Sequence, residues 1–248
     1  MDVFAKLDDA RRELNVLEHP FYQRWTAGQL SKQELSFYAG EYRHAVVALA
    51  EASSKAQAAA LDSAPAEAAG LAAHAEEEHA HIKLWEEFAR ITGASAVAET
   101  GAPPVADPGA APLAETGAAP VAEQHPLAET TACAQAWTAG EELLEHLAVL
   151  YAIEASQPAI SQTKLDGLID HYGYTPDSPA TEYFELHSIR DIEHARHTRE
   201  LIEQLMDRAG IAPDSELAER MVARARCALQ GNWALLDGVV RQFEQPTG

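Results

Sequence analysis

The sequence predicts an all-α protein, a bundle of seven or eight helices in a single domain that spans residues 1–248. Apolar residues recur at intervals of three and four along most of the chain, which is the spacing of helices with one buried face. The alternation of Val, Ile and Thr that is typical of strands is nearly absent. With 248 residues, of which 47% are hydrophobic, the chain is long enough to bury a full core.

The first half of the chain contains four predicted helices. The third of them begins with a capping box, because Ser31 is followed three residues later by Glu34. The spacing of apolar residues places all the expected helices at about residues 3–16, 20–28, 31–60, 65–92, 129–155, 158–172, 179–209 and 214–243.

Residues 94–128 interrupt the helical pattern. Ala-Glu-Thr-Gly occurs at 98–101 and again at 114–117, and each copy leads into Pro-Val-Ala. Small residues with Pro and Gly bury too little apolar area to offset the entropy lost on ordering. We therefore expect a disordered insertion inside the domain, since the helices on both sides of it carry candidate ligands.

The helices that follow the insertion are bounded by local signals. Pro158 starts a new helix after 129–155, because proline is tolerated in a first turn. Gly173 and Gly210 are placed to end the next two helices. Asp214 is expected to cap the last helix.

Charge and composition narrow the range of partners. The formal net charge of −21 argues against binding to nucleic acid or to an anionic membrane, since both would repel the chain. The N-terminus has no apolar signal region, and no segment approaches the length of a membrane span. Cys133 and Cys227 lack a Cys-x-x-Cys pairing, which indicates free thiols. We expect a cytoplasmic protein, with a homodimer as an open alternative.

One segment has the spacing of a metal-binding helix. His187, Asp191 and His194 lie at i, i+4 and i+7, so at about 100° per residue they fall within about 60° of one another on one face. The alternative is an ordinary charged surface, which Arg190 and Glu193 show this helix also has.

Two other helices carry ligand types of the same kind. Glu77 and Glu78 precede His81 by four and three residues, and Glu154 lies in an otherwise largely apolar segment, where an unpaired acid is costly to bury. Mixed carboxylate and imidazole ligands from facing helices are typical of dinuclear iron or manganese centres. Structural zinc, by contrast, prefers four nitrogen or sulfur ligands that leave no coordination position open. We expect two first-row ions, Fe/Fe or Fe/Mn.

The order of these residues resembles that of the haem-oxygenase-like di-metal oxidases, and within them the para-aminobenzoate synthases related to the chlamydial protein associating with death domains. The resemblance covers nearly the whole chain apart from the insertion and the last helix. It depends on Leu17-Glu-His-Pro-Phe-Tyr22, Phe37-Tyr38-Ala-Gly-Glu-Tyr42, His81-Ile-Lys-Leu-Trp85, Leu150-Tyr-Ala-Ile-Glu154 and the run from His187 to Arg196.

The resemblance implies a set of six metal ligands and leaves one of them open. In the family a few more residues separate the acid from the histidine of the His-Ile-x-Leu-Trp run. Glu77 is therefore the first choice, Glu78 the second, and His74, seven residues before His81, a substitute. The implied ligands are Glu77, His81, Glu154, His187, Asp191 and His194.

The family is thought to make para-aminobenzoate, a folate precursor, from a tyrosine of its own chain. The reaction depends on dioxygen and an external electron donor, and a lysine gives the amino nitrogen. The matching residues are Tyr22 as the consumed ring, Tyr38 as a second redox-active or supporting phenol, and Lys164 as the amino donor. Considered without the family, the two tyrosines are ordinary core aromatics and the lysine a surface residue.

Three other functions remain open at this stage. A di-iron oxidase could act on a free small amino acid or fatty acid, with Tyr22 only lining the pocket. A cofactor-free oxidase, similar to the pyrroloquinoline-quinone synthases, would not need the full set of carboxylates. A non-enzymatic interaction protein is suggested only by the family name. Bound metal and oxygen consumption would separate the first of these from the other two.

Overall fold

The computed structural model describes residues 2–94 and 125–244, and all regular elements in these ranges are helical, as predicted. The elements are α1 (Val3–Glu13), the 3-10 helix η1 (Val16–Glu18), α2 (Pro20–Thr26), α3 (Lys32–Ser63), α4 (Ala68–Thr92), α5 (Ala128–Trp137), α6 (Leu143–Glu154), α7 (Gln157–His171), α8 (Glu182–Ala209) and α9 (Glu216–Arg241).

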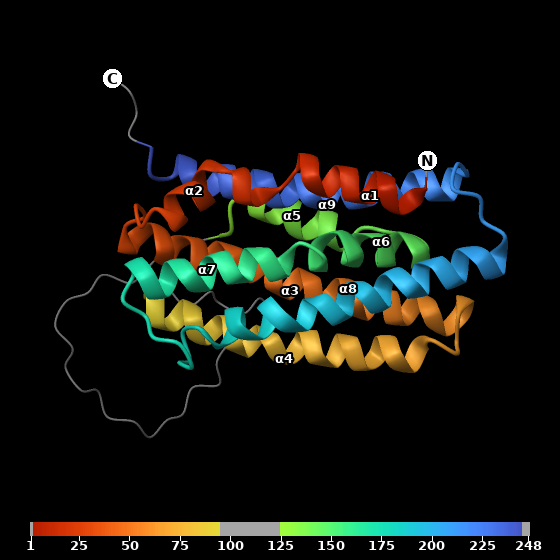
Figure 1. Ribbon diagram of the computed structural model, residues 1–248, viewed down its shortest axis with the longest axis horizontal. Helices are drawn as coiled ribbons and strands as arrows, with labels where there is room; N and C mark the ends of the chain where they lie inside the picture. Colours follow the sequence, from red (N-terminus) through yellow and green to blue (C-terminus); the bar gives the residue numbers. More distant parts are fainter. Residues whose placement is uncertain (1, 95–124, 245–248) are drawn as a thin grey trace, which may run out of the picture.

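The helices form a layered bundle in which α4 and the α1–α9 pair lie on opposite sides (Figure 1). The long helix α3 packs against α4, α5 and α6, while α9 packs against α1, α5 and α6. On another side of the bundle α7 and α8 pack against each other, and α8 also contacts α4 and α6. Residues far apart in the sequence are thus brought together where α4, α6 and α8 meet.

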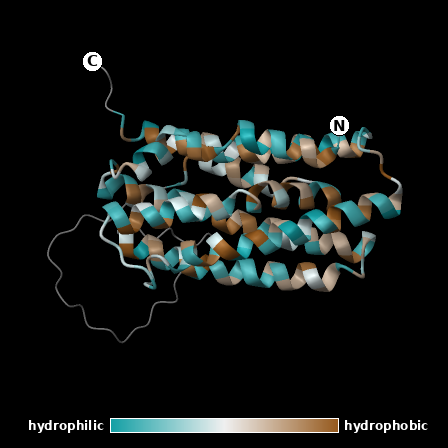
Figure 2. Ribbon diagram, viewed as in Figure 1, coloured by the Kyte–Doolittle hydropathy of each residue, from teal (hydrophilic) through white to brown (hydrophobic). Residues whose placement is uncertain are grey.

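The helices differ in how many of their faces are buried, and this difference places a carboxylate in the core. Hydrophilic and hydrophobic residues alternate along the outer helices (Figure 2), as expected when one face of each helix is buried. The short helix α6 is different, because every residue from Leu143 to Glu154 is buried. Its last residue therefore places a carboxylate inside the core, where it needs a partner.

Several predicted helix ends are confirmed. Ser31 and Glu34 form both halves of the capping box at the start of α3. Gly210 ends α8 in the left-handed conformation, at φ 63°. The cap expected at Asp214 is wrong by one residue, because the side chain of Ser215 accepts the bond from the amide of Ala218.

The single helix predicted at 129–155 is instead two helices, α5 and α6, separated by residues 138–142. Gly140 in this break has φ 157°, and a Cβ added there would lie 2.8 Å from the ring of His146. The Glu145 carboxylate then accepts the backbone N–H groups of Glu141 and Glu142 at the start of α6. The apolar spacing runs on through the break, so periodicity alone did not reveal it.

Two further predictions concern the rest of the chain. Most of the expected insertion at 94–128 lies outside the described residues, which resume at residue 125 just before α5. Among the helices that the structure describes, none is both long and apolar enough to cross a membrane.

Candidate metal centre and aromatic pocket

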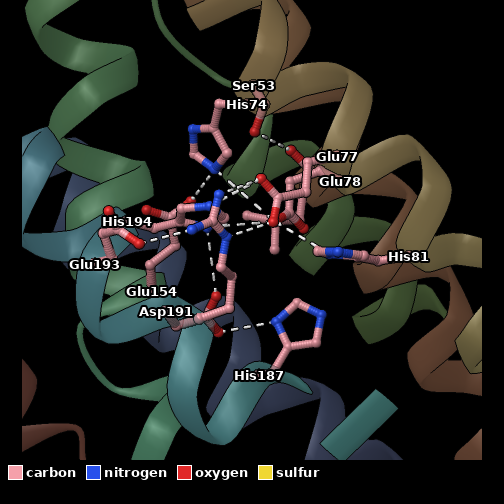
Figure 3. Close-up of polar contacts among 12 residues, drawn as sticks. Ser53, His74, Glu77, Glu78, His81, Glu154, His187, Asp191, Glu193 and His194 are labelled. Carbon is pink, nitrogen blue, oxygen red and sulfur yellow. Dashed lines mark hydrogen bonds and ion pairs between the residues drawn. The ribbon is translucent and has the colours of Figure 1, made fainter. Parts of the chain in front are cut away.

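Seven ligand-type side chains converge where three helices meet (Figure 3). Each helix contributes from the face that it turns inward, so residues three, four and seven apart in sequence meet at one place. Six of the seven are buried and one, His74, is nearly so. They are His74, Glu78 and His81 from α4, Glu154 from α6, and His187, Asp191 and His194 from α8.

Glu78 lies at the centre of this cluster. With His74 and His194 it forms one group of ligand atoms that all lie within 4.8 Å of one another. With His81 and His187 it forms a second such group. A single carboxylate shared by two three-residue groups could serve as a ligand to two ions.

The remaining two carboxylates lie beside these groups. Oε1 of Glu154 lies 2.9 Å from Nε2 of His74, on the side of the first group. Oδ2 of Asp191 lies 2.9 Å from Nδ1 of His187 in the second group, and its Oδ1 lies 3.6 Å from Nδ1 of His194 in the first. Each group can therefore offer one ion two carboxylates and two imidazoles, a mixed oxygen and nitrogen set that suits iron or manganese.

The cluster contains most of the unsatisfied polar atoms in the core. Buried polar atoms are nearly always hydrogen-bonded, so each exception requires an explanation. Two first-row cations at this place would satisfy these atoms together, and the residues therefore fit a dinuclear metal centre. Among the described residues, the buried atoms without a hydrogen-bond partner include Oε1 of Glu78, Nδ1 of His81, Oε2 of Glu154, Nε2 of His187, Oδ1 of Asp191 and Nδ1 of His194.

The electrostatics of the cluster favour positive charge. Burial disfavours the charged form of His74, but the carboxylates of Glu154 and Glu78 outweigh it and raise its pKa to about 9. Burial also raises the pKa of Glu154 itself, despite the opposing effect of His74. The pKa of His187 is likewise raised, because Asp191 overcomes the effect of burial. The carboxylates thus stabilise protons on the neighbouring imidazoles. The same negative potential would stabilise a bound cation.

Glu77, the first choice for the open ligand position, lies at the edge of the cluster, where it is paired with Arg190 and has Oε2 3.4 Å from Nε2 of His194. Its oxygens accept bonds from Nε and Nη2 of Arg190, the latter at 2.8 Å. The Glu77 side chain is 28% exposed, whereas that of Glu78 is 2% exposed. The bonds from Arg190 outweigh partial burial and lower the pKa of Glu77 to about 2. The structure therefore places the second and third choices, Glu78 and His74, in the cluster.

The three residues that the resemblance assigns to the reaction meet in a second buried region. The hydroxyl oxygens of Tyr22 on α2 and Tyr38 on α3 are 3.2 Å apart. Nζ of Lys164 on α7 lies 5.7 Å from the centroid of the Tyr22 ring and 5.6 Å from that of Tyr38. Burial raises the pKa of both phenols well above the usual value.

Lys164 is enclosed by aromatic rings and is 1% exposed. Besides the two tyrosines, its amine lies 4.4 Å from the centroid of Tyr42 and 5.3 Å from that of Trp85. Burial without a nearby carboxylate disfavours the ammonium form and lowers the pKa of Lys164 to about 7. A substantial share of this lysine is therefore a neutral, nucleophilic amine at neutral pH.

Aromatic contacts connect this pocket to the cluster. The ring centroid of Trp85 lies 6.1 Å from that of Tyr38 and 4.9 Å from that of Tyr183. The Tyr183 ring in turn lies 4.2 Å from the ring of His187. The candidate reaction residues and the candidate ligands thus belong to one continuous buried region.

The sequence alone did not single out Tyr42 or Tyr183. Both have a helical signal that could have found them, because Tyr42 follows Tyr38 by four residues and Tyr183 precedes His187 by four. Each therefore lies on the same helix face as a residue that was singled out.

Comparison with known proteins identifies relatives. A protein of Chlamydia muridarum named 4-aminobenzoate synthase is 30% identical over 213 residues, covering 83% of this chain and 79% of its own length. A protein of the same name from Nitrosomonas europaea is 28% identical over 252 residues, covering 96% of this chain and 91% of its own length.

Solved structures agree on the fold. A TenA homologue from P. horikoshii superposes with a TM-score of 0.67 at 16% identity, covering 97% of this chain and 99% of that one. A Shewanella denitrificans domain with a haem-oxygenase-like fold superposes with a TM-score of 0.72 at 17% identity, covering 98% of this chain and 94% of that one. Residues 42–233 match a family model described as an iron-containing redox enzyme. The family resemblance is confirmed: this chain is an oxidoreductase and belongs to the haem-oxygenase-like family of iron-containing redox enzymes.

Proposed function

We propose that the protein is a di-metal, oxygen-dependent oxidase that forms 4-aminobenzoate from the ring of its own Tyr22, with Lys164 as the amino donor. The observation that carries the proposal is the enclosure of the Lys164 amine with the Tyr22 and Tyr38 rings, beside a buried cluster of metal-ligand side chains. The name of the relatives supports the same product.

The metal ions would be held by the seven converging side chains. His74, Glu154 and His194 would bind one ion, His81, His187 and Asp191 the other, and Glu78 would bridge the two. Two first-row ions, Fe/Fe or Fe/Mn, would supply the coupling of dioxygen reduction to one-electron oxidation of the protein, with electrons from an external donor. We place no ligand role on Glu77.

The Tyr22 phenol is set up to lose a proton and an electron together. A phenol of ordinary pKa is already protonated at neutral pH, and the raised pKa of Tyr22 extends this to more alkaline pH, so oxidation removes an electron from the phenol and not from a preformed phenolate. The hydroxyl of Tyr38, 3.2 Å away, is the neighbouring group through which the proton or the radical can pass. Tyr38 therefore takes the role of supporting phenol.

Lys164 supplies the nitrogen because its amine is neutral in part. An ammonium group has no free electron pair, whereas the neutral amine can attack the ring carbon that carries the phenol oxygen once the ring is oxidised. That oxygen would leave as water, and the nitrogen would stay on the ring when the bond between Nζ and Cε of Lys164 is cleaved, with dioxygen as the oxidant. The aromatic enclosure holds this amine over the tyrosine rings and excludes water, which would compete as a nucleophile.

The experiment uses protein made with ring-labelled tyrosine, freed of small molecules and then given iron or manganese, a reductant and dioxygen. Labelled 4-aminobenzoate should be released at no more than one equivalent per chain, measured by mass spectrometry. Tyr22→Phe should abolish release because phenylalanine lacks the oxidisable hydroxyl. Lys164→Arg should also abolish it, since a guanidinium stays protonated.

Matched controls exclude general damage. Tyr174→Phe removes a phenol on the loop after α7, and Lys83→Arg changes an exposed lysine of α4, so both should keep wild-type yield. The Tyr22 and Lys164 variants should keep wild-type metal content, because neither residue is a proposed ligand. Unlabelled product, or many turnovers on an added small molecule, would replace self-consumption with the conventional oxidase reaction.

A further inference from the structure

We propose that Glu77 is a positioning residue that accepts the N–H of His194, and so holds the other ring nitrogen of that histidine toward the metal centre. This inference depends on the proposed dinuclear centre and assigns to Glu77 a role that differs from the ligand role expected from its spacing. Arg190 would hold the Glu77 carboxylate in place.

The two ring nitrogens of His194 face different surroundings. Nδ1 is buried, has no hydrogen-bond partner among the described residues, and lies 3.7 Å from Oε1 of Glu78 and 3.6 Å from Oδ1 of Asp191. Nε2 lies 3.4 Å from Oε2 of Glu77. One nitrogen therefore faces the cluster, and the other faces a carboxylate at its edge.

A neutral imidazole carries one N–H, and a metal binds the nitrogen that lacks it. If Nδ1 of His194 is the ligand atom, the proton must be on Nε2, where Glu77 accepts it. Carboxylates that accept the second N–H of a ligating histidine fix both its tautomer and its ring orientation. Glu77 has the charge and the location for this role.

The other histidine of α8 shows the same division. Nδ1 of His187 lies 2.9 Å from Oδ2 of Asp191, while its Nε2 is buried and without a hydrogen-bond partner in the described part of the chain. Each histidine thus has one nitrogen within 3.4 Å of a carboxylate oxygen and one buried nitrogen that has no hydrogen-bond partner among the described residues. Glu77 lies beside Nε2 of His194 in the same way that Oδ2 of Asp191 lies beside Nδ1 of His187.

Arg190 prevents Glu77 from turning into the cluster. Its Nε and Nη2 contact the two oxygens of Glu77, and Nη1 contacts Glu193 at 2.7 Å. A two-point contact between guanidinium and carboxylate fixes the plane of the carboxylate. One edge of Glu77 is therefore occupied by Arg190, and Oε2 remains beside His194.

The test measures Co²⁺ binding to the purified full chain, by competition with a chelator and by the ligand-field absorption bands of the ion. Glu77→Ala should weaken one of the two binding steps about 10- to 100-fold, the usual effect of losing such a partner. Glu77→Gln should restore much of the loss, because the amide oxygen still accepts an N–H. Glu76→Ala, which removes an exposed acid from the same helix, should bind as the wild type does.

A double-mutant cycle separates positioning from ligation. In a His194→Ala background, Glu77→Ala should cause no further loss, since Glu77 acts only through His194. Independent, multiplying losses would overturn the proposal and return Glu77 to the ligand set. Wild-type affinity and absorption bands in Glu77→Ala would overturn it as well.

Two further measurements keep these outcomes interpretable. The metal-free variants should have the helical circular dichroism of the wild type, and if Glu77→Ala does not, the comparison passes to Glu77→Gln and Arg190→Gln. Arg190→Gln should weaken binding less than Glu77→Ala, and a larger loss would count against the proposal. Failure of the wild type to bind Co²⁺, Mn²⁺ or Fe²⁺ would instead refute the proposed function itself.

Discussion

The amine of Lys164 is surrounded by aromatic rings instead of water, and the loss of hydration raises the free energy of its charged form. Cation–π contacts compensate only part of the loss of hydration of an ammonium group. The uncompensated part of the lost hydration lowers the pKa of Lys164, so the folded protein binds this proton less tightly than an exposed lysine would. The rings that lie within 6 Å of the amine are those of Tyr22, Tyr38, Tyr42, Trp85 and Phe184.

We therefore predict that Lys164→Met stabilises the fold, by about 4 kcal/mol at pH 7 in urea unfolding. The pKa of about 7 in the folded chain lies below the usual 10.5, so the unfolded chain binds more protons between these values. Wild-type stability should rise with pH across this window, and its difference from the variant should shrink. Lys83→Met at an exposed position should show neither effect.

Glu78 and His74 differ in the number of candidate metal ions that each would bind. Because Glu78 belongs to both groups of ligand atoms and His74 to one, their removal should have different consequences. We predict that Glu78→Ala loses both ions, whereas His74→Ala retains about one per chain. Metal analysis after dialysis checks this, with Glu76→Ala as the control. Equal losses in the two variants would contradict a bridging Glu78.

The sequence could place the ligand helices but not choose between adjacent acids. His187, Asp191 and His194 come together as their spacing indicates, since a helix fixes their relative directions. Glu77 and Glu78 are both within one turn of His81, so spacing allows either. The choice depends on Arg190, which comes from another helix and attracts Glu77 outward.

At the scale of elements, the contact between α2 and α7 holds the aromatic pocket together. Trp25 on α2 donates its indole N–H to the carbonyl oxygen of Lys164 at 3.1 Å. Its ring lies against Gly167, where an added Cβ would be 2.5 Å from two atoms of the indole. The absence of a side chain at this glycine allows the two helices to approach.

We predict that Gly167→Ala destabilises the protein by about 1–3 kcal/mol, because the fully buried indole cannot move aside without strain. It should also reduce product yield by displacing Trp25 and the neighbouring tyrosine rings. Gly70→Ala is the matched control in α4, where nothing lies within 4 Å of the added Cβ. That change should stabilise by about 0.5–1 kcal/mol through helix propensity. Thermal unfolding of both variants distinguishes the two effects.

Helix ends were predictable where a local signal sets them. Ser31 with Glu34 and Gly210 act within one or two turns, so the sequence contains the whole cause. The break before α6 is also local, because the chain turns at Gly140 against the ring of His146, but a lone glycine within a continuing apolar spacing does not by itself mark a helix end. At the start of α9, Asp214 and Ser215 are both good caps, and adjacent signals of equal strength leave a one-residue error.

At the scale of the whole molecule, the cluster joins helices that come from three separate parts of the chain. In the absence of a cation, its carboxylates and imidazoles keep unsatisfied polar atoms inside the core, which is costly. A ligand that binds only the folded state stabilises that state in proportion to its saturation. Metal binding and the stability of the bundle are therefore expected to be coupled.

We predict that Mn²⁺ raises the melting temperature of the metal-free protein, with about 2.7 kcal/mol gained at a concentration 100 times the Kd. Hydrogen exchange should slow mainly in α4 and α8, which supply most of the candidate ligands. Glu78→Ala should abolish both responses. An equal temperature shift in that variant would indicate binding at surface carboxylates.

The complete burial of Tyr22 has a consequence for the lifetime of the protein. If the chain gives up this ring, it leaves a void the size of an aromatic side chain between α2 and α3, and voids of this kind cost about 3–5 kcal/mol. Because the ring is 1% exposed, the product can leave only if the helices around it move apart. A spent molecule would thus be easier for a protease to recognise than a fresh one, and each molecule of product would be matched by one discarded chain.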